Sequence, residues 1–167
     1  RFDFFCGGIA IPSREIESER LLRKGSNGIE FFTTQVLYDS GKIKKMLKYY
    51  DEICKKNRVL PRRILLSFAP VSSKKNIDFL KWLGVEIPSL TEQHLTNKGT
   101  DITEESLKIA TDILKDILVN NEKLGITVPI GLNVEHIMSY NFQYSINMLQ
   151  ELSKIYREFC IKTSLYD

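Results

Sequence analysis

Several features that mark common classes of protein are scarce or missing in this 167-residue sequence. Its three cysteines, Cys6, Cys54 and Cys160, form neither a CxxC pair nor an obvious disulfide framework, so we expect reduced, mostly buried thiols. Its two histidines, His94 and His136, lie far apart, and no Ser or Cys nucleophile with partners stands at a recognisable spacing. The sequence therefore predicts no metal site and no hydrolase triad.

Long apolar runs are also missing, and none approaches the roughly 20 residues of a membrane-spanning helix. No basic leader followed by a small-residue cleavage site opens the chain, so we expect a cytoplasmic protein that does not enter a membrane. The hydrophobic fraction of 43% and the charged fraction of 27% are those of an ordinary globular protein. The net charge of +3 is small. A run of lysines is therefore interpreted as a solvated helix face and not as a nucleic-acid site: Lys42, Lys44, Lys45 and Lys48.

What the sequence does contain is an alternation of strand and helix patterns. Four apolar runs have strand length and are rich in β-branched or aromatic residues: Phe2 to Ile11, Ile29 to Tyr38, Ile64 to Ala69 and Thr127 to Val134. Helical spacing predicts a helix after an N-cap at Ser40, one between Ser73 and Gly84, one between Thr103 and Gly125, and one from about Asn141. A further helix carries Lys24. The stretch from Glu86 to Asp101 is the one irregular insertion.

Strands that alternate with helices predict a parallel sheet with right-handed crossovers. Four such units fit either a small doubly wound sheet or half of a closed eight-stranded barrel, and periodicity does not choose between them. No GxGxxG turn follows the first strand, which favours the barrel. The chain also begins at Arg1, inside an apparent strand, so we expect it to be part of a longer domain.

Polar residues near strand ends are candidate site residues, because chemistry in parallel α/β proteins gathers at the carboxyl ends of the strands. Gln35 interrupts an apolar strand, where its amide either contacts a ligand or satisfies a neighbouring segment. Asn133 and Glu135 share one side of the last strand, where the carboxylate is either a base or anchor for a ligand or a cap for the following loop. Lys24 is either solvated helix surface or a ligand contact.

Four segments, in order, resemble the methylenetetrahydrofolate reductase family: Gly7-Gly8-Ile9-Ala10-Ile11-Pro12, Lys24 to Asp39, Ser67-Phe68-Ala69-Pro70-Val71-Ser72, and Gly131-Leu132-Asn133. The spacing from Lys24 to Gln35 is the most specific part of this resemblance. It implies an α/β fold, a (β/α)8 TIM barrel, of which this chain covers about strands five to eight. Residues 1–167 would then be the C-terminal half of one barrel domain, with the N-terminal half absent from this sequence.

The resemblance also implies an activity in one-carbon metabolism, on the route to methionine. It implies an FAD-dependent oxidoreductase that reduces a methylene group on a folate-type carrier to methyl with hydride from NAD(P)H. Gln35 would contact the pterin, and Glu17 and Lys24 would contact the ribityl–phosphate chain of the flavin. The other implied contacts are Ala10 and Ile11 for the flavin, and Phe79, Leu80 and Leu132 for the substrate. Asn133 and Glu135 are added as substrate contacts because they lie at the end of the last strand.

Departures from the family pattern leave the exact carrier open. Ile11 stands where the family often has a flavin-contacting tyrosine, and Val134 stands where an arginine can follow the last strand. The family's catalytic acidic residues belong to strands that would precede Arg1. The alternative is a non-catalytic or divergent half-barrel subunit that binds a pterin or a partner chain. Either form leaves bare sheet edges, which predicts pairing with a missing N-terminal half or with a second copy.

Overall fold

The computed structural model describes residues 4–97 and 99–163. Its strands are β1 (Gly7–Ala10), β2 (Phe31–Thr34), β3 (Arg63–Phe68) and β4 (Ile130–Val134). Its helices are α1 (Glu17–Ser26), α2 (Gly41–Asn57), α3 (Lys74–Trp82), α4 (Ser89–Thr96), α5 (Ile102–Leu124) and α6 (Phe142–Thr163), with a short 3-10 turn, η1 (Ser139–Asn141), before α6. None of the described helices is long and apolar enough to cross a lipid bilayer.

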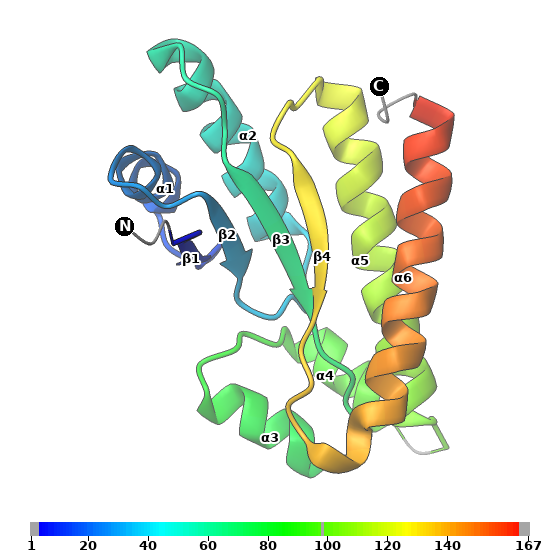
Figure 1. Cartoon of the computed structure of the whole chain (residues 1–167). Helices are drawn as coiled ribbons and strands as arrows, with labels where there is room; N and C mark the ends of the chain where they lie inside the picture. Colours follow the sequence, from blue (N-terminus) through cyan, green and yellow to red (C-terminus); the bar gives the residue numbers. More distant parts are fainter. Residues whose placement is uncertain (1–3, 98, 164–167) are drawn as a thin grey trace.

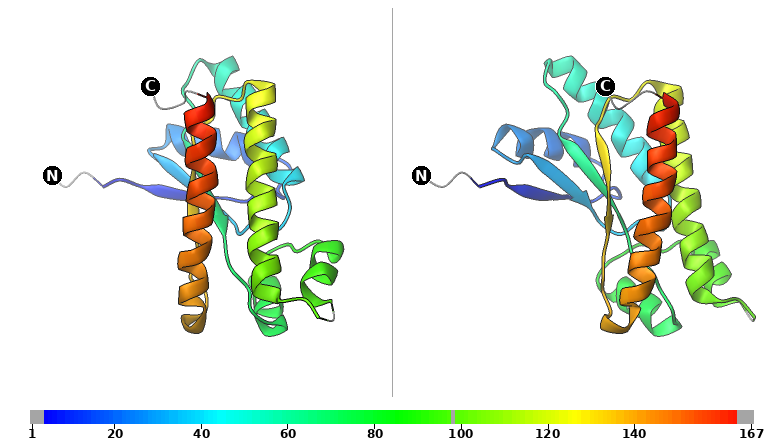
Figure 2. Two further views of the ribbon diagram at one scale, coloured as in Figure 1. Left: turned by 90° about the vertical axis from the view of Figure 1, so that its right-hand side faces the viewer. Right: turned by 45° about the vertical axis from the view of Figure 1, so that its right-hand side comes forward.

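The four strands form one parallel sheet in the order β1-β2-β3-β4, so each strand pairs with its neighbour in sequence. Because the strands run the same way, their carboxyl ends meet at one edge of the sheet. Figure 1 shows α3 and α4 below this edge, and both views of Figure 2 agree. Figure 1 also shows α5 and α6 side by side next to β4. The connections after β3 and β4 therefore gather at the carboxyl end of the sheet.

The predicted α/β class is confirmed, but the (β/α)8 barrel with this chain as strands five to eight is wrong. The described residues form an open four-stranded sheet with β1 and β4 at its edges. Strand–helix alternation predicts parallel neighbours and crossovers, and both are present. Closure into a barrel depends on the tilt and stagger of more strands than these, which no pattern in the sequence encodes.

Most predicted elements are present, with shorter strands than the apolar runs suggested. The run from Phe2 to Ile11 contains the strand Gly7–Ala10, and Phe2 and Asp3 lie outside the described residues. The insertion from Glu86 to Asp101 was predicted to be irregular but contains the helix α4. The sequence of α4, SLTEQHLT, has only two apolar residues and so carries almost no helical periodicity.

One predicted cap is also wrong. Ser40 precedes α2, but its hydroxyl makes no capping hydrogen bond. Instead, the carboxylate of Asp39 accepts from the backbone N–H groups of Gly41 and Lys42, at 3.1 and 3.2 Å. A carboxylate at this place also suits the partial positive charge of a helix N-terminus. The caps at Ser73 and the stop at Gly125 agree with the prediction.

The main core lies between one face of the sheet and the helices α1, α2, α5 and α6. Successive strand side chains point to opposite faces. On the helix-facing side, Phe32, Ile64 and Leu66 are fully buried. They pack with Leu47 of α2 and Leu114 of α5, which are also 0% exposed. Burial of each such side chain stabilises the fold by roughly 1.5–3 kcal/mol.

A smaller core lies at the carboxyl end of the sheet, under α3 and α4. It holds Val71, Ile77, Leu80 and Leu95, all at most 1% exposed. A polar cluster beside it ties the loop after β3 to the turn after β4. Asn141 donates to Pro70 O at 3.3 Å and to Asn76 Oδ1 at 3.1 Å. These bonds hold α3 in place at the edge where the strands end.

A buried carboxylate joins α2 to the segment before β4. Asp51 is 4% exposed and accepts from the backbone N–H and the hydroxyl of Thr127, at 2.9 and 2.7 Å. Lys55 pairs with its second oxygen at 2.5 Å. Burial alone would raise the pKa of Asp51, but the hydrogen bonds from Lys55 and Thr127 outweigh burial and hold the pKa below its ordinary value of 3.8.

We predict that Asp51→Asn lowers the free energy of unfolding by about 1–3 kcal/mol at pH 7, because the amide cannot replace a charged acceptor. Since the folded pKa is depressed, the contribution of Asp51 is present above about pH 4 and is lost as the pH falls below it. Urea unfolding at pH 7 and pH 3 measures both effects, with the exposed neighbour Glu52→Gln as control. A deficit that is the same at both pH values would contradict this account.

Candidate functional site

A cavity of about 630 Å³ lies at the carboxyl end of the sheet. Its walls come from three places: the turn after β1, the segment Gln35–Asp39 after β2, and the connection from α3 to α4. Lys42, at the start of α2, and Lys81, near the end of α3, also line it. The cavity thus lies where strand-end chemistry was expected from the sequence.

Gln35 is the predicted site residue that lines this cavity. Its backbone N–H continues the pairing of β2 with β1 by donating to Ala10 O at 2.9 Å. Its side-chain Nε2 donates to Gly84 O at 2.8 Å, across the cavity. Gly84 adopts a φ of +84°, which favours glycine and turns the chain after α3. Within the described part of the chain the acceptor Oε1 forms no hydrogen bond, so it is available to a ligand donor.

Charged side chains gather at the rim of the cavity. Lys42 pairs with Glu86, and Lys81 pairs with Glu92 at 2.9 Å. All four side chains are at least a quarter exposed, and exposed ion pairs contribute only about 0–1 kcal/mol. Both lysines can therefore exchange their present partner for an anionic group of a ligand at little cost.

Tyr38 supplies a buried hydroxyl to the wall of the same cavity. The hydroxyl donates to Ala69 O at 3.0 Å. Burial raises the pKa of Tyr38 well above its ordinary value, so the group stays protonated at neutral pH. Tyr38 therefore forms part of the wall and cannot act as a base, and its single O–H is already donated to Ala69 O.

The exposed aromatic residue on α3 is Trp82, whereas the sequence analysis singled out Phe79 and Leu80. Leu80 is 1% exposed and belongs to the smaller core. Phe79 is half-buried and stacks on Trp82, with ring centroids 5.8 Å apart and an angle of 25° between the rings. Trp82, which sequence reasoning missed, is 79% exposed. The exposure of Trp82 could have been predicted, because Trp82 does not lie on the apolar stripe of its helix.

A second group of predicted residues lies along the ends of β3 and β4. Asn133 donates through Nδ2 to Ser67 Oγ at 3.1 Å and to Glu135 Oε1 at 3.4 Å. The backbone N–H of Glu135 donates to Phe68 O at 2.8 Å, which extends the pairing of the two strands. Leu132 belongs to the opposite face and packs on the main core. The structure thus brings Asn133 and Glu135 together and separates both from Leu132.

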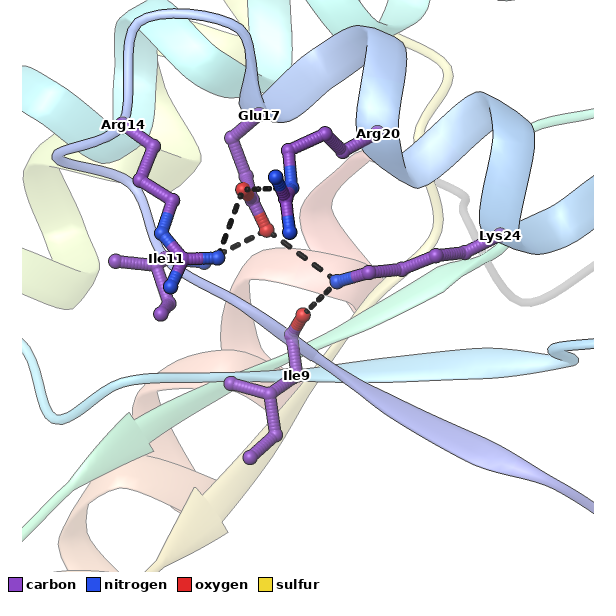
Figure 3. A network of polar contacts seen from close by, with 6 residues as sticks. All are labelled: Ile9, Ile11, Arg14, Glu17, Arg20 and Lys24. Carbon is purple, nitrogen blue, oxygen red and sulfur yellow. Dashed lines mark hydrogen bonds and ion pairs between the residues drawn. The ribbon is translucent and has the colours of Figure 1, made fainter.

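The predicted flavin contacts Glu17 and Lys24 lie together at α1 (Figure 3). Glu17 is 0% exposed. Its Oε1 accepts from the backbone N–H of Ile11 at 3.2 Å and lies 3.5 Å from Lys24 Nζ. Lys24 in turn donates to Ile9 O at 2.6 Å. The pair therefore fastens the end of β1 to α1, a structural role that the spacing alone did not indicate.

Two arginines complete this cluster. Glu17 Oε2 lies 3.5 Å from Arg20 Nε and 3.8 Å from Arg14 Nη1, and Figure 3 shows both guanidinium groups beside the carboxylate. Both atoms of the closer contact, Oε2 and Nε, are buried without a hydrogen bond among the described residues. Three cations surround one carboxylate here, so the cluster carries excess positive charge. Such a cluster can accept a phosphate group while Glu17 stays paired.

Two further predicted residues flank the cluster. Ala10 is fully buried at the end of β1, and Ile11 is half-buried beside Glu17. Across residues 4–97 and 99–163, no three His, Cys, Asp or Glu side chains gather into a set that could hold a metal ion.

We predict that Glu17→Gln lowers the free energy of unfolding by about 1–3 kcal/mol. The amide can keep the hydrogen bond from Ile11 but leaves three cations around a neutral group. Thermal or urea unfolding measures the loss, and Glu19→Gln, an exposed residue in the same first turn, is the matched control. Equal losses in the two variants would show that the buried cluster contributes nothing specific.

Comparison with solved structures gives a likeness that bears on the ligand class. No protein-family model and no curated protein matches the chain. The structure is similar to that of an uncharacterized protein from Clostridium thermocellum that binds two copies of 5-methyl-5,6,7,8-tetrahydrofolic acid, with 30% sequence identity and a TM-score of 0.81. The match covers 92% of this chain and 55% of that chain, so this chain spans about half the length of its neighbour. The neighbour is thus a folate-binding protein, and membership of the methylenetetrahydrofolate reductase family is not shown.

Proposed function

We propose that this chain binds a reduced folate of the 5-methyltetrahydrofolate type in the cavity at the carboxyl end of its sheet. The observation that carries the proposal is the position of Gln35, which presents a half-exposed amide in the wall of that cavity. The folate-binding neighbour, similar over nearly the whole of this chain, supports the same ligand class.

The chemistry of the cavity matches the two ends of a folate. A pterin ring carries donors and acceptors side by side along its edge, and a carboxamide offers one of each. A folate also ends in glutamate carboxylates, for which Lys42 and Lys81 at the rim are suitable partners. A volume of about 630 Å³ lies within the range of small-molecule sites.

Binding would exchange internal contacts for ligand contacts. The amide nitrogen of Gln35 already donates to Gly84 O, so its free acceptor, Oε1, would receive a pterin N–H. Asn133 and Glu135 lie on the same edge of the sheet, two strands away from Gln35. Strand spacing puts them roughly 10 Å from Gln35. In this proposal they take the far edge of the ligand. The stacked rings of Phe79 and Trp82 lie outside the cavity lining, on the same helix as the lining residue Lys81.

The finer proposal is a methylenetetrahydrofolate reductase-like activity, which rests on the resemblance centred on Lys24 and Gln35. Bound FAD would supply hydride transfer from NAD(P)H to a methylene carrier. The cluster at α1 fits the phosphates of such a cofactor, because its three cations outnumber Glu17 and two of them, Arg14 and Arg20, are more than a third exposed. Lys24 would keep its bond to Ile9 O and offer a remaining N–H.

A second candidate function is folate binding without redox chemistry. It is favoured by the state of Glu17 and Lys24, which already satisfy each other and the backbone around β1. On this reading the cluster is purely structural, and the chain is a divergent pterin-binding subunit. The two candidates differ in whether the protein holds flavin.

We predict that 5-methyltetrahydrofolate binds saturably and that Gln35→Ala weakens binding about tenfold or more, since one buried hydrogen bond to the ligand is lost. The chain has one tryptophan, Trp82, which follows the cavity-lining Lys81 on α3, so its fluorescence serves as a second readout of binding beside calorimetry. Gln150→Ala on the exposed side of α6 is the control. The proposal fails if no saturable binding occurs, or if both variants bind as the unaltered protein does.

We predict further that the protein takes up FAD and shows flavin absorption in the blue. Lys24→Met lowers flavin occupancy severalfold, because a cation beside the phosphates is lost, whereas Lys48→Met on the exposed face of α2 leaves it unchanged. A colourless protein that ignores added FAD but still binds 5-methyltetrahydrofolate would reject the reductase and leave the non-redox function. Loss of both ligands would reject both candidates.

A further inference from the structure

One face of the sheet has no helix packed over its apolar side chains in the described chain. This open face, which points away from the main core, carries Phe5, Ile9, Phe31 and Leu65, and none of them belongs to either core. Phe31 and Leu65 are half-buried, whereas Ile9 is 64% exposed and Phe5 is 73% exposed. In Figure 1, β3 lies in front of α2, and no helix crosses in front of β3 or β4. Parallel sheets almost always have both faces covered, so this apolar face marks a surface for interaction.

Two glycines make the open face flat. A Cβ on Gly7 would lie 2.5 Å from Phe31 Cζ, so the ring of Phe31 lies across Gly7. Phe5 stacks on the same ring, with centroids 5.3 Å apart and an angle of 15° between the rings. A Cβ on Gly131 would lie 2.7 Å from Leu65 Cδ2, so Leu65 lies across Gly131. A flat apolar surface is suited to a second flat surface, as in sheets that pack face to face about 10 Å apart.

The two edges of the sheet, by contrast, are partly covered by side chains, although the sequence predicted bare edges. At β1, Lys24 donates to Ile9 O at 2.6 Å, and Glu17 accepts from the next outward N–H at 3.2 Å. At β4, Tyr156 donates to Ile130 O at 2.9 Å. Such contacts occupy backbone groups that an added strand would need. We therefore expect this sheet to associate through its open face and not through its edges.

The open face carries opposite charges at its two ends. Arg63 begins β3 and is exposed, and Glu135 follows the end of β4 and is half-buried. Side chains two residues apart on a strand share a face, so Arg63 lies on the side of Leu65, and Glu135 lies on the side of Gly131, which pairs with Leu65. Arg63 gives one N–H to Ile130 O and retains others. An antiparallel second copy would bring Arg63 of each copy to Glu135 of the other, whereas a parallel one would bring like charges together.

We propose that a second copy of this chain covers the open face, with the strands of the two copies antiparallel about a two-fold axis. A two-fold contact joins the same surface of both copies, so that surface must complement itself. The open face does so, because its centre is apolar and its ends carry opposite charges. The structurally similar folate-binding protein has nearly half of its chain without a counterpart here, and a second copy supplies a comparable amount of further protein. Glu135 is also assigned to the edge of the folate, so a folate molecule and the second copy compete for it.

The size of the open face sets the strength of this dimer. Four strands about 4.8 Å apart and roughly 20 Å long give a plane of roughly 400 Å² on each copy. Stable specific complexes bury about 1,200–2,000 Å² in total, so the dimer belongs with weak complexes. We expect it to dissociate with a constant on the order of 10–100 μM and to depend on protein concentration.

Sedimentation of the full chain without folate, from about 1 μM to about 1 mM, is expected to show a reversible equilibrium of monomer and dimer. Ile9→Lys places a charge on the open face of each copy and raises the dissociation constant at least about tenfold. Val119→Lys makes the same change at a 57% exposed position of α5, away from this face, and leaves the dimer unchanged. Thermal melting of dilute samples verifies that both variants fold.

Charge reversal tests how the two copies are arranged. Arg63→Glu alone and Glu135→Arg alone each place like charges opposite one another, so each variant stays monomeric at concentrations where the unaltered chain dimerises. An equal mixture of the two variants restores opposite charges at both contacts, so a dimer forms again. Only contacts between copies can produce this rescue, because neither chain is altered by mixing.

Three results would overturn the proposal. A monomer at every concentration would mean that a different chain covers the open face. A dimer that Ile9→Lys and Val119→Lys leave equally intact would use another surface. A mixture of the charge-reversed variants that stays monomeric would exclude the antiparallel arrangement. None of these measurements uses folate, so each result is separate from the test of the folate site.

Discussion

Burial of one face of a four-stranded parallel sheet is the interaction on which the other features of this protein depend. Phe32, Ile64 and Leu66 are removed from water only because every connection brings its helix back to the same side. The same constraint makes all four strands run one way and end at one edge. Gln35, Asn133 and the α3–α4 region meet there although they are far apart in the sequence.

The position of the candidate site follows from this arrangement and needs few dedicated interactions. Gln35 and Gly84 are 49 residues apart, yet the smaller core under α3 holds them at hydrogen-bond distance. At α1, the buried Glu17 fixes the end of β1 through Ile11 and keeps cations around itself. In both places the groups proposed to contact a ligand are also groups that hold the fold together, which explains why sequence alone left their roles open.

The parts of the fold that could be predicted are those with local signals. α5 has an apolar stripe and ends at Gly125 in a left-handed conformation, so both its existence and its end were readable. α2 could be predicted for the same reason. Its N-cap was assigned to Ser40, whereas Asp39 makes the capping hydrogen bonds, because two adjacent cap-forming residues cannot be ranked from sequence. α4 lacked periodicity and was missed.

The parts that could not be predicted depend on contacts between distant segments. Whether a parallel sheet closes is decided by strand number and stagger, and the barrel inferred from the family resemblance was wrong for the described chain. The hydrogen bond from Gln35 to Gly84, the exposure of Trp82 and that of Ile9 on the open face all require the packed structure. The family resemblance identified Glu17, Lys24 and Gln35 from their spacing. It did not indicate that Glu17 and Lys24 form an ion pair with each other.

The central claim is that a reduced folate occupies the cavity beside Gln35. A crystal structure of the protein grown with 5-methyltetrahydrofolate tests it most directly. The account predicts ligand density between the Gln35–Asp39 segment and the α3–α4 connection, with a pterin N–H within hydrogen-bond distance of Gln35 Oε1. Folate density found away from this cavity, with Gln35 still bound only to Gly84, would contradict it.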